Sequence, residues 1–441
     1  MTNESEPKPK ALALLPFLVF AVFYVGLSVW AGDFYKVPMP VAFVIASAVA
    51  LAFRFRPRLS DRIETYAQGM GEANIMIMCL IFILAGAFAS VAKGSGAVDA
   101  AVTVARALVP ANLLLAGVFV ISGLISLAIG TSCGTIAAVT PIALGFAGPL
   151  GLGPAMLVGA VVGGAMFGDN LSMISDTTIA ATRTQGVEMR EKFVANFRIV
   201  LPAAVLSAVL YALLGNASGG GEVAAAVVTW RECVLVLPYL MILVLALLGF
   251  NVMLLLFSGT VFASVIGLWA GRIDFWGVFD LLGKGALGMS ETLIVAILAG
   301  GLFSTIRANG GIAWLTERIA RLVKGPRSCE FGVSLLVGAV NLFTANNTVA
   351  IVIAGPIAKA CSERFGANPT RVASVLDTVS CVVQGLIPYG AQILIAVGVA
   401  KTEQVPFESL ELLKYLYYQP LLALAVVVSM VFAGAKARRR G

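Results

Sequence analysis

The sequence predicts an all-α polytopic membrane protein, and three observations lead to this class. Hydrophobic residues make up 59% of the 441 residues and charged residues only 12%, whereas charged residues are about 25% of a soluble domain. The mean hydropathy is +0.96. Apolar runs near the roughly 20 residues that cross a bilayer recur along the chain, for example at 11–31, 37–53, 74–92 and 193–214. We therefore expect these runs to be membrane helices and no separate soluble domain to be present.

The distribution of charge argues against a nucleic-acid partner. The net charge is +7, but the basic residues lie in short connections between apolar runs, which is how cytoplasmic loops orient a membrane protein. The six cysteines are isolated from one another, and the chain has no histidine, so neither a zinc site nor a disulfide is expected. A proton carrier in this chain must then be a carboxylate or a lysine. The expected partners are membrane lipid and an ion or small-molecule substrate.

An internal repeat divides the chain. A shift of about 214 residues aligns LAGAFASVAKGSG at 84–96 with LAGGLFSTIRANG at 298–310, and one residue more aligns GTSCGTIAAVTPIA at 130–143 with ANNTVAIVIAGPIA at 345–358. Such ordered matches are typical of transporter halves. We predict a cytoplasmic tail at 1–10, a first repeat at 11–214, an external linker at 215–230, a second repeat at 231–435 and a basic cytoplasmic tail at 436–441.

Each half contains an apolar stretch with a polar break at its centre, at 113–148 and at 328–363. Such a stretch either crosses the membrane or returns as a re-entrant hairpin. Re-entrant hairpins place most of the 30 lysines and arginines on one side, as cytoplasmic loops require. We therefore predict two inverted repeats with about ten transmembrane helices, two re-entrant hairpins, broken helices at 154–181 and 369–400, and both termini in the cytoplasm. The expected location is the cytoplasmic (inner) membrane of a prokaryote.

Two acids lie inside an apolar stretch of the first half. An acid at the bilayer centre costs about 2.5 to 3.5 kcal/mol, so such residues are functional by default. Asp169 and Asp176 flank the predicted break in the helix, which would let Ser172, Ser175 and backbone carbonyls turn toward the same point. Carboxylate, hydroxyl and carbonyl oxygens are the ligands of hard cations. We expect Asp169 and Asp176 to bind a cation such as sodium or to carry a proton.

The breaks of the second half carry amides in place of paired acids. A planar amide pair with hydroxyls suits a carboxylate or a zwitterion, and helix N-termini add positive charge. For Asp377, an ion pair with an arginine of the scaffold is the alternative. The residues expected to bind a substrate or a second cation are Asn346, Asn347, Thr348, Ser374, Asp377, Thr378 and Gln384.

The motif pair GTSCGT at 130–135 and GDNLSMISDTT at 168–178 resembles that of the NhaC-type sodium/proton antiporter family. In that family a tryptophan often takes the place of Cys133 and a proline that of Met173. The resemblance implies cation-coupled secondary transport, an elevator-type movement of a hairpin-bearing unit, and a homodimer. The cation- or proton-binding residues that it implies, together with their polar neighbours, are Asp169, Asp176, Thr131, Ser132, Asn170, Ser172, Ser175 and Thr177.

The predicted function is therefore cation-coupled secondary transport, by sodium/proton antiport or sodium-dependent exchange. The alternative is sodium- or proton-coupled transport of a small organic solute such as an amino acid or a carboxylate. A channel would need filter segments repeated around a pore, which internal duplication with half-helices argues against. An enzyme is not expected, because the chain has no histidine and no G-x-S-x-G. The only cofactor expected is the coupling ion.

Overall fold

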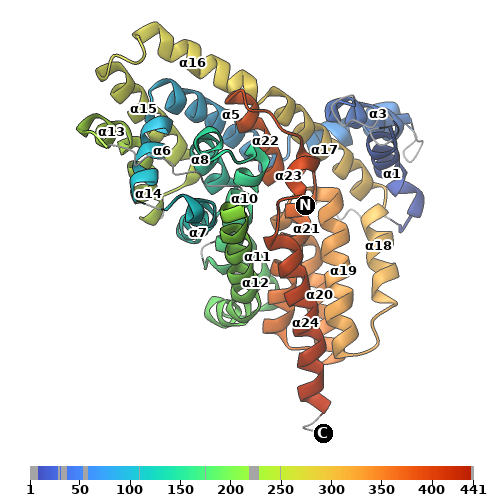
Figure 1. Cartoon of the computed structure of the whole chain (residues 1–441). Helices are drawn as coiled ribbons and strands as arrows, with labels where there is room; N and C mark the ends of the chain where they lie inside the picture. The colour runs from blue at the N-terminus through green and yellow to red at the C-terminus, as the bar shows by residue number, and fades with distance from the viewer. Residues whose placement is uncertain are drawn as a thin grey trace. The chain divides into compact units, whose positions relative to one another are not determined.

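The computed structural model describes residues 8–27, 30, 37–52, 58–108, 110–173, 175–217, 228–248 and 250–438. Within these ranges the regular structure is helical, with no strand (Figure 1). Parts of three predicted segments, the tails 1–10 and 436–441 and the linker 215–230, lie outside the described residues.

The helices in chain order are η1 (Ala11–Leu14), α1 (Leu15–Ala21), η2 (Val22–Gly26), α3 (Met39–Ala52), α4 (Leu59–Met70), α5 (Ala73–Gly94), α6 (Ala97–Leu108), α7 (Ala111–Ile129), α8 (Ser132–Gly145), α9 (Ala147–Leu150), α10 (Pro154–Leu171), α11 (Asp176–Gln185), α12 (Met189–Ala217), α13 (Trp230–Leu235), α14 (Leu237–Leu247), α15 (Val252–Trp269), α16 (Phe275–Gly288), α17 (Ser290–Ala308), α18 (Gly311–Ala320), α19 (Pro326–Thr344), α20 (Asn347–Phe365), α21 (Pro369–Leu386), α22 (Ala391–Thr402), α23 (Ser409–Leu413) and α24 (Tyr418–Arg438).

Several helical segments are long and apolar enough to cross a bilayer, so the chain is a multi-pass membrane protein. In the described part of the chain there are six of them: Ala73–Gly94, Pro154–Gln185, Met189–Gly215, Val252–Trp269, Phe275–Ala308 and Pro369–Thr402. Shorter apolar helices, including Met39–Ala52, Leu113–Ile129 and Ser132–Gly145, add to the membrane-embedded material. The count of ten crossings stays a prediction.

The helices form two compact units, each built from three stretches of chain. Unit 1 comprises Met1–Cys79, Ala180–Val187 and Leu293–Ser380. Unit 2 comprises Leu80–Ile179, Glu188–Thr292 and Cys381–Gly441.

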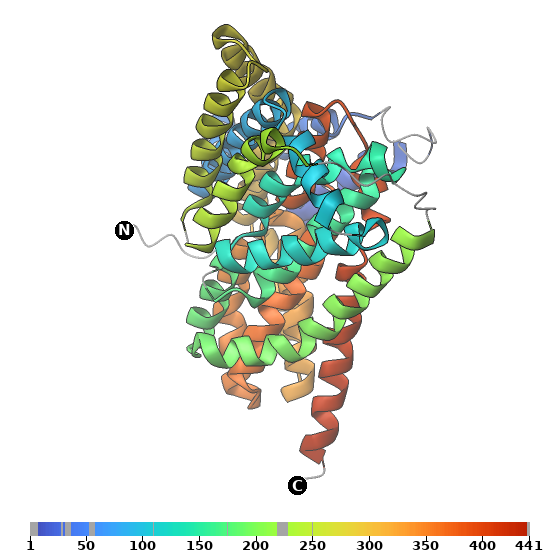
Figure 2. The same cartoon turned by 60° about the vertical axis from the view of Figure 1, so that its left-hand side comes forward.

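In unit 2, α10 packs closely against α7, and glycines make this approach possible. A Cβ atom built on Gly164 would lie 2.1 Å from the carbonyl oxygen of Phe119, and one on Gly168 would lie 2.1 Å from that of Gly123. Only a residue without a side chain fits at such a separation. In the same unit α12 packs against α7 and α24, and Figure 2 shows α12 in green beside α24 in dark red.

The helix pairs α7–α8 and α19–α20 are interrupted by the same backbone conformation. Gly130 follows α7 in the left-handed region with φ 76°, and Thr131 is extended with φ −152°. Ala345 follows α19 with φ 48°, and Asn346 is extended with φ −146°. Residues 130 and 345 are paired by the internal repeat. The shared conformation supports a duplication, while the inverted arrangement and the re-entrant path stay predictions.

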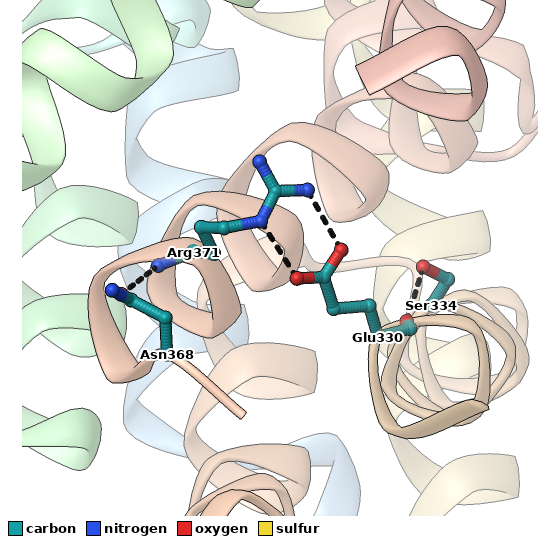
Figure 3. Close-up of polar contacts among 4 residues, drawn as sticks. All are labelled: Glu330, Ser334, Asn368 and Arg371. Carbon is teal, nitrogen blue, oxygen red and sulfur yellow. Dashed lines mark hydrogen bonds and ion pairs between the residues drawn. The ribbon is translucent and has the colours of Figure 1, made fainter. Parts of the chain in front are cut away.

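A bidentate ion pair joins α19 to α21 within unit 1 (Figure 3). Arg371 donates from Nε to Glu330 Oε1 and from a terminal nitrogen to Oε2, both at 2.7 Å. The Asn368 carboxamide oxygen accepts from the Arg371 backbone N–H at 3.2 Å, which caps the start of α21. The side chains of Arg371 and Glu330 are 29% and 11% exposed. Arg371 therefore holds α21 against α19.

Arg371→Met is expected to lower the free energy of unfolding by about 2 kcal/mol, because it leaves the Glu330 carboxylate largely buried without its partner; a fully buried pair would lose about 3 to 5 kcal/mol. The residues that the repeat pairs with Glu330 and Arg371 are Leu115 and Met156. The double variant Glu330→Leu/Arg371→Met is therefore expected to recover most of the loss. Thermal unfolding in detergent measures both. Equal losses in the single and double variants would contradict the assignment.

Candidate functional site

The first predicted carboxylate lies where a helix is interrupted. Asp169 occupies the last turn of α10, which ends at Leu171, and α11 begins at Asp176. Asp169 is only 4% exposed. The chain between the two helices leaves the helical path, as the sequence predicts for a break between the two aspartates.

Hydroxyl groups from two directions donate to the Asp169 carboxylate. Ser132, the first residue of α8, donates to Oδ2 from its hydroxyl at 2.7 Å and from its backbone N–H at 3.3 Å. Ser175, just before α11, donates its hydroxyl to Oδ1, and the Ser175 and Thr177 hydroxyl oxygens lie 2.9 Å apart. All four residues are buried. The structure thus brings together Ser132, Asp169, Ser175 and Thr177 of the predicted set.

The N-terminus of α8 points at the same carboxylate. Its first N–H groups have no acceptor within the helix, and the helix dipole places partial positive charge there. The Ser132 N–H bond to Asp169 uses one of these groups. The left-handed Gly130 and extended Thr131 turn the chain so that α8 starts at this point. The interruption between α7 and α8 therefore supplies electrostatic stabilisation for a negative charge at Asp169.

Two amides from the second repeat extend this network. Gln392, near the start of α22, donates from Nε2 to the Ser132 hydroxyl at 3.0 Å. Gln384, near the end of α21, donates from Nε2 to Gln392 Oε1 at 2.9 Å. The repeat pairs Gln384 with Asp169. Gln384 therefore joins the Asp169 network and is not separate from it.

Asp176 differs from Asp169 in its surroundings. It is exposed at the first position of α11, and it takes no part in the buried hydrogen bonds described above. The sequence predicts that both acids bind the cation or carry the proton, and the structure buries Asp169 but leaves Asp176 exposed. The helix dipole at the N-terminus of α11 favours a negative charge at Asp176.

The remaining residues of the first set support the interruption of the helix. Asn170 is fully buried and donates from Nδ2 to the Tyr418 hydroxyl at 3.0 Å. The Ser172 carbonyl accepts from the Thr178 hydroxyl at 2.7 Å. Thr131 is half-buried at the N-cap of α8.

The other residues predicted for the second half lie in unit 1. Asn346 caps α20 by accepting from the Val349 N–H at 3.0 Å, and Asn347 accepts from the Thr348 N–H at 3.1 Å. On α21, the three predicted residues Ser374, Asp377 and Thr378 are all buried. A shared site of all the predicted residues stays a prediction.

Sequence reasoning missed a lysine and an asparagine on α12. Lys192 lies among acids and an arginine, yet its side chain is fully buried. Lys192 and Asn196 both donate to the Asn170 carbonyl, at 3.3 and 2.9 Å. Residues four apart lie on one face of a helix, and this spacing is the sequence feature that could have indicated their shared contact.

The sequence predicts a closing helix at 415–433, which corresponds to α24, but it assigns no residue of this helix to the site. Tyr418 accepts from Asn170, and its neighbour Gln419 packs on Gly385, where a Cβ atom would lie 2.8 Å from the Gln419 side chain. The repeat pairs Asn170 with Gly385. Successive residues of α24 thus contact corresponding positions of the two halves.

Another buried carboxyl lies just past the end of α22. Glu403 is 3% exposed and pairs with Lys93 at 3.2 Å. Burial raises the pKa of Glu403 from its ordinary 4.5 to about 7, and the Lys93 ammonium acts in the opposite direction. The folded chain therefore holds this proton more tightly than the unfolded chain.

The stabilisation from Glu403 is present in full below about pH 4.5 and is lost as the pH rises through about 7. Glu403→Gln, which mimics the protonated group, is expected to remove this loss and to gain up to about 3 kcal/mol over the wild type at about pH 8. Thermal unfolding in detergent at about pH 5 and pH 8 measures it. The control is Glu291→Gln, whose exposed pair with Lys401 contributes little. Parallel pH dependences of wild type and Glu403→Gln would contradict this assignment.

A multi-pass helical chain with a buried carboxylate at a helix interruption is the arrangement of a secondary transporter. The model of the Na+/H+ antiporter family matches residues 11–216 and 222–434. The chain therefore belongs to the Na+/H+ antiporter family, and it has NhaC relatives.

The relatives have different exchange reactions in their names. The Na+/H+ antiporter NhaC of Bacillus subtilis is 25% identical over 429 residues, covering 88% of this chain and 91% of its own length. The malate-2H+/Na+-lactate antiporter of the same organism is 22% identical, covering 85% and 86%. The arginine/ornithine antiporter ArcD of Halobacterium salinarum is 25% identical, covering 72% and 70%.

One solved transporter matches this chain over nearly its whole length. The YdaH transporter of Alcanivorax borkumensis has a TM-score of 0.43 and 14% identity, covering 97% of this chain and 99% of its own. This level of similarity does not establish a shared fold.

Proposed function

We propose that the chain exchanges sodium for protons, with Asp169 as the group that carries either ion. The observation that supports this is the buried Asp169 carboxylate with hydroxyls on both of its oxygens. A carboxylate in the membrane is stable when a proton or a cation neutralises it. Because one carboxylate holds only one of the two at a time, binding of sodium requires release of the proton.

The hydroxyls around Asp169 suit both states of this exchange. A hydroxyl is a donor and also an acceptor with two lone pairs. Ser132 and Ser175 donate to the carboxylate as described. When sodium binds, rotation of these hydroxyls presents their oxygens to the cation, and Thr177 supplies a further oxygen. Exposed Asp176 would attract the cation on its way to Asp169, which assigns it a part in entry rather than in tight binding.

Sodium-driven proton movement in proteoliposomes tests the proposal. An imposed sodium gradient, with a pH-sensitive dye inside vesicles that hold no organic solute, is expected to produce a pH change that depends on the gradient. No pH change from folded, correctly inserted protein would reject sodium/proton antiport.

Exchange of an organic solute is the second candidate. The specific observation is that Gln384 and Gln392 are bonded into the Asp169 network, where a bare cation needs no amide donors. Two relatives have names that include organic acids or amino acids. Uptake of labelled hydroxy acids or amino acids under a sodium gradient, without the dye response above, would favour this candidate.

The inverted repeats, the elevator-type movement, the homodimer, the inner-membrane location and the cytoplasmic termini also belong to this proposal. The repeated backbone at Gly130 and Ala345 supports the duplication on which they depend. Cysteine accessibility at the two ends of the chain in intact cells tests the orientation.

A further inference from the structure

A lysine ammonium is buried next to the Asp169 site. Lys192, in the first turn of α12, is 1% exposed. Its Nζ donates to the Thr178 hydroxyl at 2.6 Å and to the Asn170 carbonyl at 3.3 Å. Asn170 follows Asp169 directly in the chain, and Thr178 lies in the first turn of α11. The ammonium therefore bridges the two sides of the helix interruption.

The groups around this ammonium are oxygen ligands of the kind that bind monovalent cations. The Asn170 carbonyl belongs to the last turn of α10, where the helix dipole is negative. The Thr178 hydroxyl donates to the Ser172 carbonyl at 2.7 Å, so its lone pairs face the ammonium. Freed carbonyls at a broken membrane helix coordinate Na+ in the same way.

A neutral donor could make the two hydrogen bonds of Lys192 described above. Asn196 donates to the same Asn170 carbonyl at 2.9 Å, and a neutral side chain could donate to Thr178. A buried lysine must lose its hydration, and buried lysines are rare for that reason. A buried positive charge among oxygen ligands is the feature that Lys192 shares with a bound monovalent cation.

We propose that the Lys192 ammonium is a tethered cation. It occupies an oxygen-lined position beside Asp169 that would otherwise bind a second mobile Na+, and it thereby fixes how many cations move in each cycle. The inference rests on the proposed cation exchange for its meaning in transport. Binding of Na+ at this position depends only on the oxygen ligands, so a binding measurement tests it without any transport.

The binding test uses the full chain with Asp169→Asn, which removes the first cation site. In detergent, Asp169→Asn/Lys192→Gln is expected to gain thermal stability with rising NaCl and not with choline chloride, since a ligand of the folded state stabilises it by mass action. Asp169→Asn alone is expected to respond equally to both salts. Lys284→Gln in the same background is the control, because Lys284 is 70% exposed. Equal responses to both salts in the Lys192 variant overturn the proposal.

The transport test counts the cations moved per cycle. From the sodium gradient that balances a fixed pH gradient in proteoliposomes held at zero membrane potential, Lys192→Gln is expected to move one more Na+ per cycle than the wild type, while Lys192→Arg keeps the wild-type number. An unchanged number in an active Lys192→Gln overturns the proposal.

If Lys192→Gln does not fold in choline chloride, its recovery in NaCl supports the latent site, and failure in both salts overturns it. A wild type without sodium-coupled flux rejects the proposed function and leaves the binding test intact.

Discussion

Asp169→Asn is expected to reduce sodium-coupled proton flux at least about 100-fold while leaving the folded protein as stable as the wild type or more stable. The amide keeps the size of the side chain but has no charge for either ion to neutralise. Removing a charge from membrane depth also removes a cost of about 2.5 to 3.5 kcal/mol. Loss of activity without loss of stability separates an ion-carrying role from a structural one.

The measurement pairs dye-reported flux in proteoliposomes with thermal unfolding of the same preparation. Asp176→Asn is the informative comparison: because Asp176 is exposed, we expect a several-fold rise in the sodium concentration for half-maximal flux, with maximal flux retained. Asp280→Asn, at an exposed acid paired with Lys284, is the neutral control. Retained flux in Asp169→Asn, or total loss in Asp176→Asn alone, would reverse the roles assigned to the two acids.

Gly168→Ala is expected to cost about 3 kcal/mol or more of unfolding free energy, since overpacking by one methyl typically costs 1 to 3 kcal/mol even against side chains that can move. Here the new Cβ would lie 2.1 Å from the Gly123 carbonyl and 2.7 Å from the Leu127 backbone nitrogen. Backbone atoms inside α7 cannot move aside, so α10 must separate from α7. Because Asp169 is the next residue, its contact with Ser132 is expected to be lost as well.

The matched control for Gly168→Ala is Gly117→Ala. Gly117 lies on α7 and has nothing within 4 Å of an added Cβ, so alanine is expected to be neutral or to stabilise the helix by up to about 1 kcal/mol. The yield of monodisperse protein and its thermal unfolding in detergent measure both variants. A Gly168→Ala protein as stable as the wild type would show that α7 and α10 do not approach as described.

The sequence predicted the positions of the helix interruptions because local chemistry sets them. An interruption at Gly130 or after Asp169 frees backbone groups, and polar neighbours mark where those groups can be satisfied. The membrane class followed from composition alone. Asp169, Ser132, Ser175 and Thr177 lie in one hydrogen-bond network, while their roles in ion binding stay a prediction.

The sequence did not reveal that Asp169 and not Asp176 is buried, or that Lys192 is buried. Burial of Asp169 depends on α8 and α22, which pack against α10 from other parts of the sequence, whereas Asp176 is exposed at the start of α11. Lys192 lies among charged residues that look solvated, and its burial depends on α12 packing against the end of α10. Such tertiary contacts leave no local pattern in a single sequence.

The helix α24, which has no counterpart in the aligned parts of the two halves, contacts both halves at corresponding positions. Asn170 and Gly385 correspond in the repeat, and Tyr418 and Gln419 contact them from adjacent positions on one rigid helix. After a duplication, each copy can drift separately, but a substitution in α24 alters the surroundings of both copies at once. In this family, substitutions at Tyr418 and Gln419 are therefore expected to accompany substitutions at both 170 and 385. Covariation among these four positions would then show how the two halves diverged in sequence.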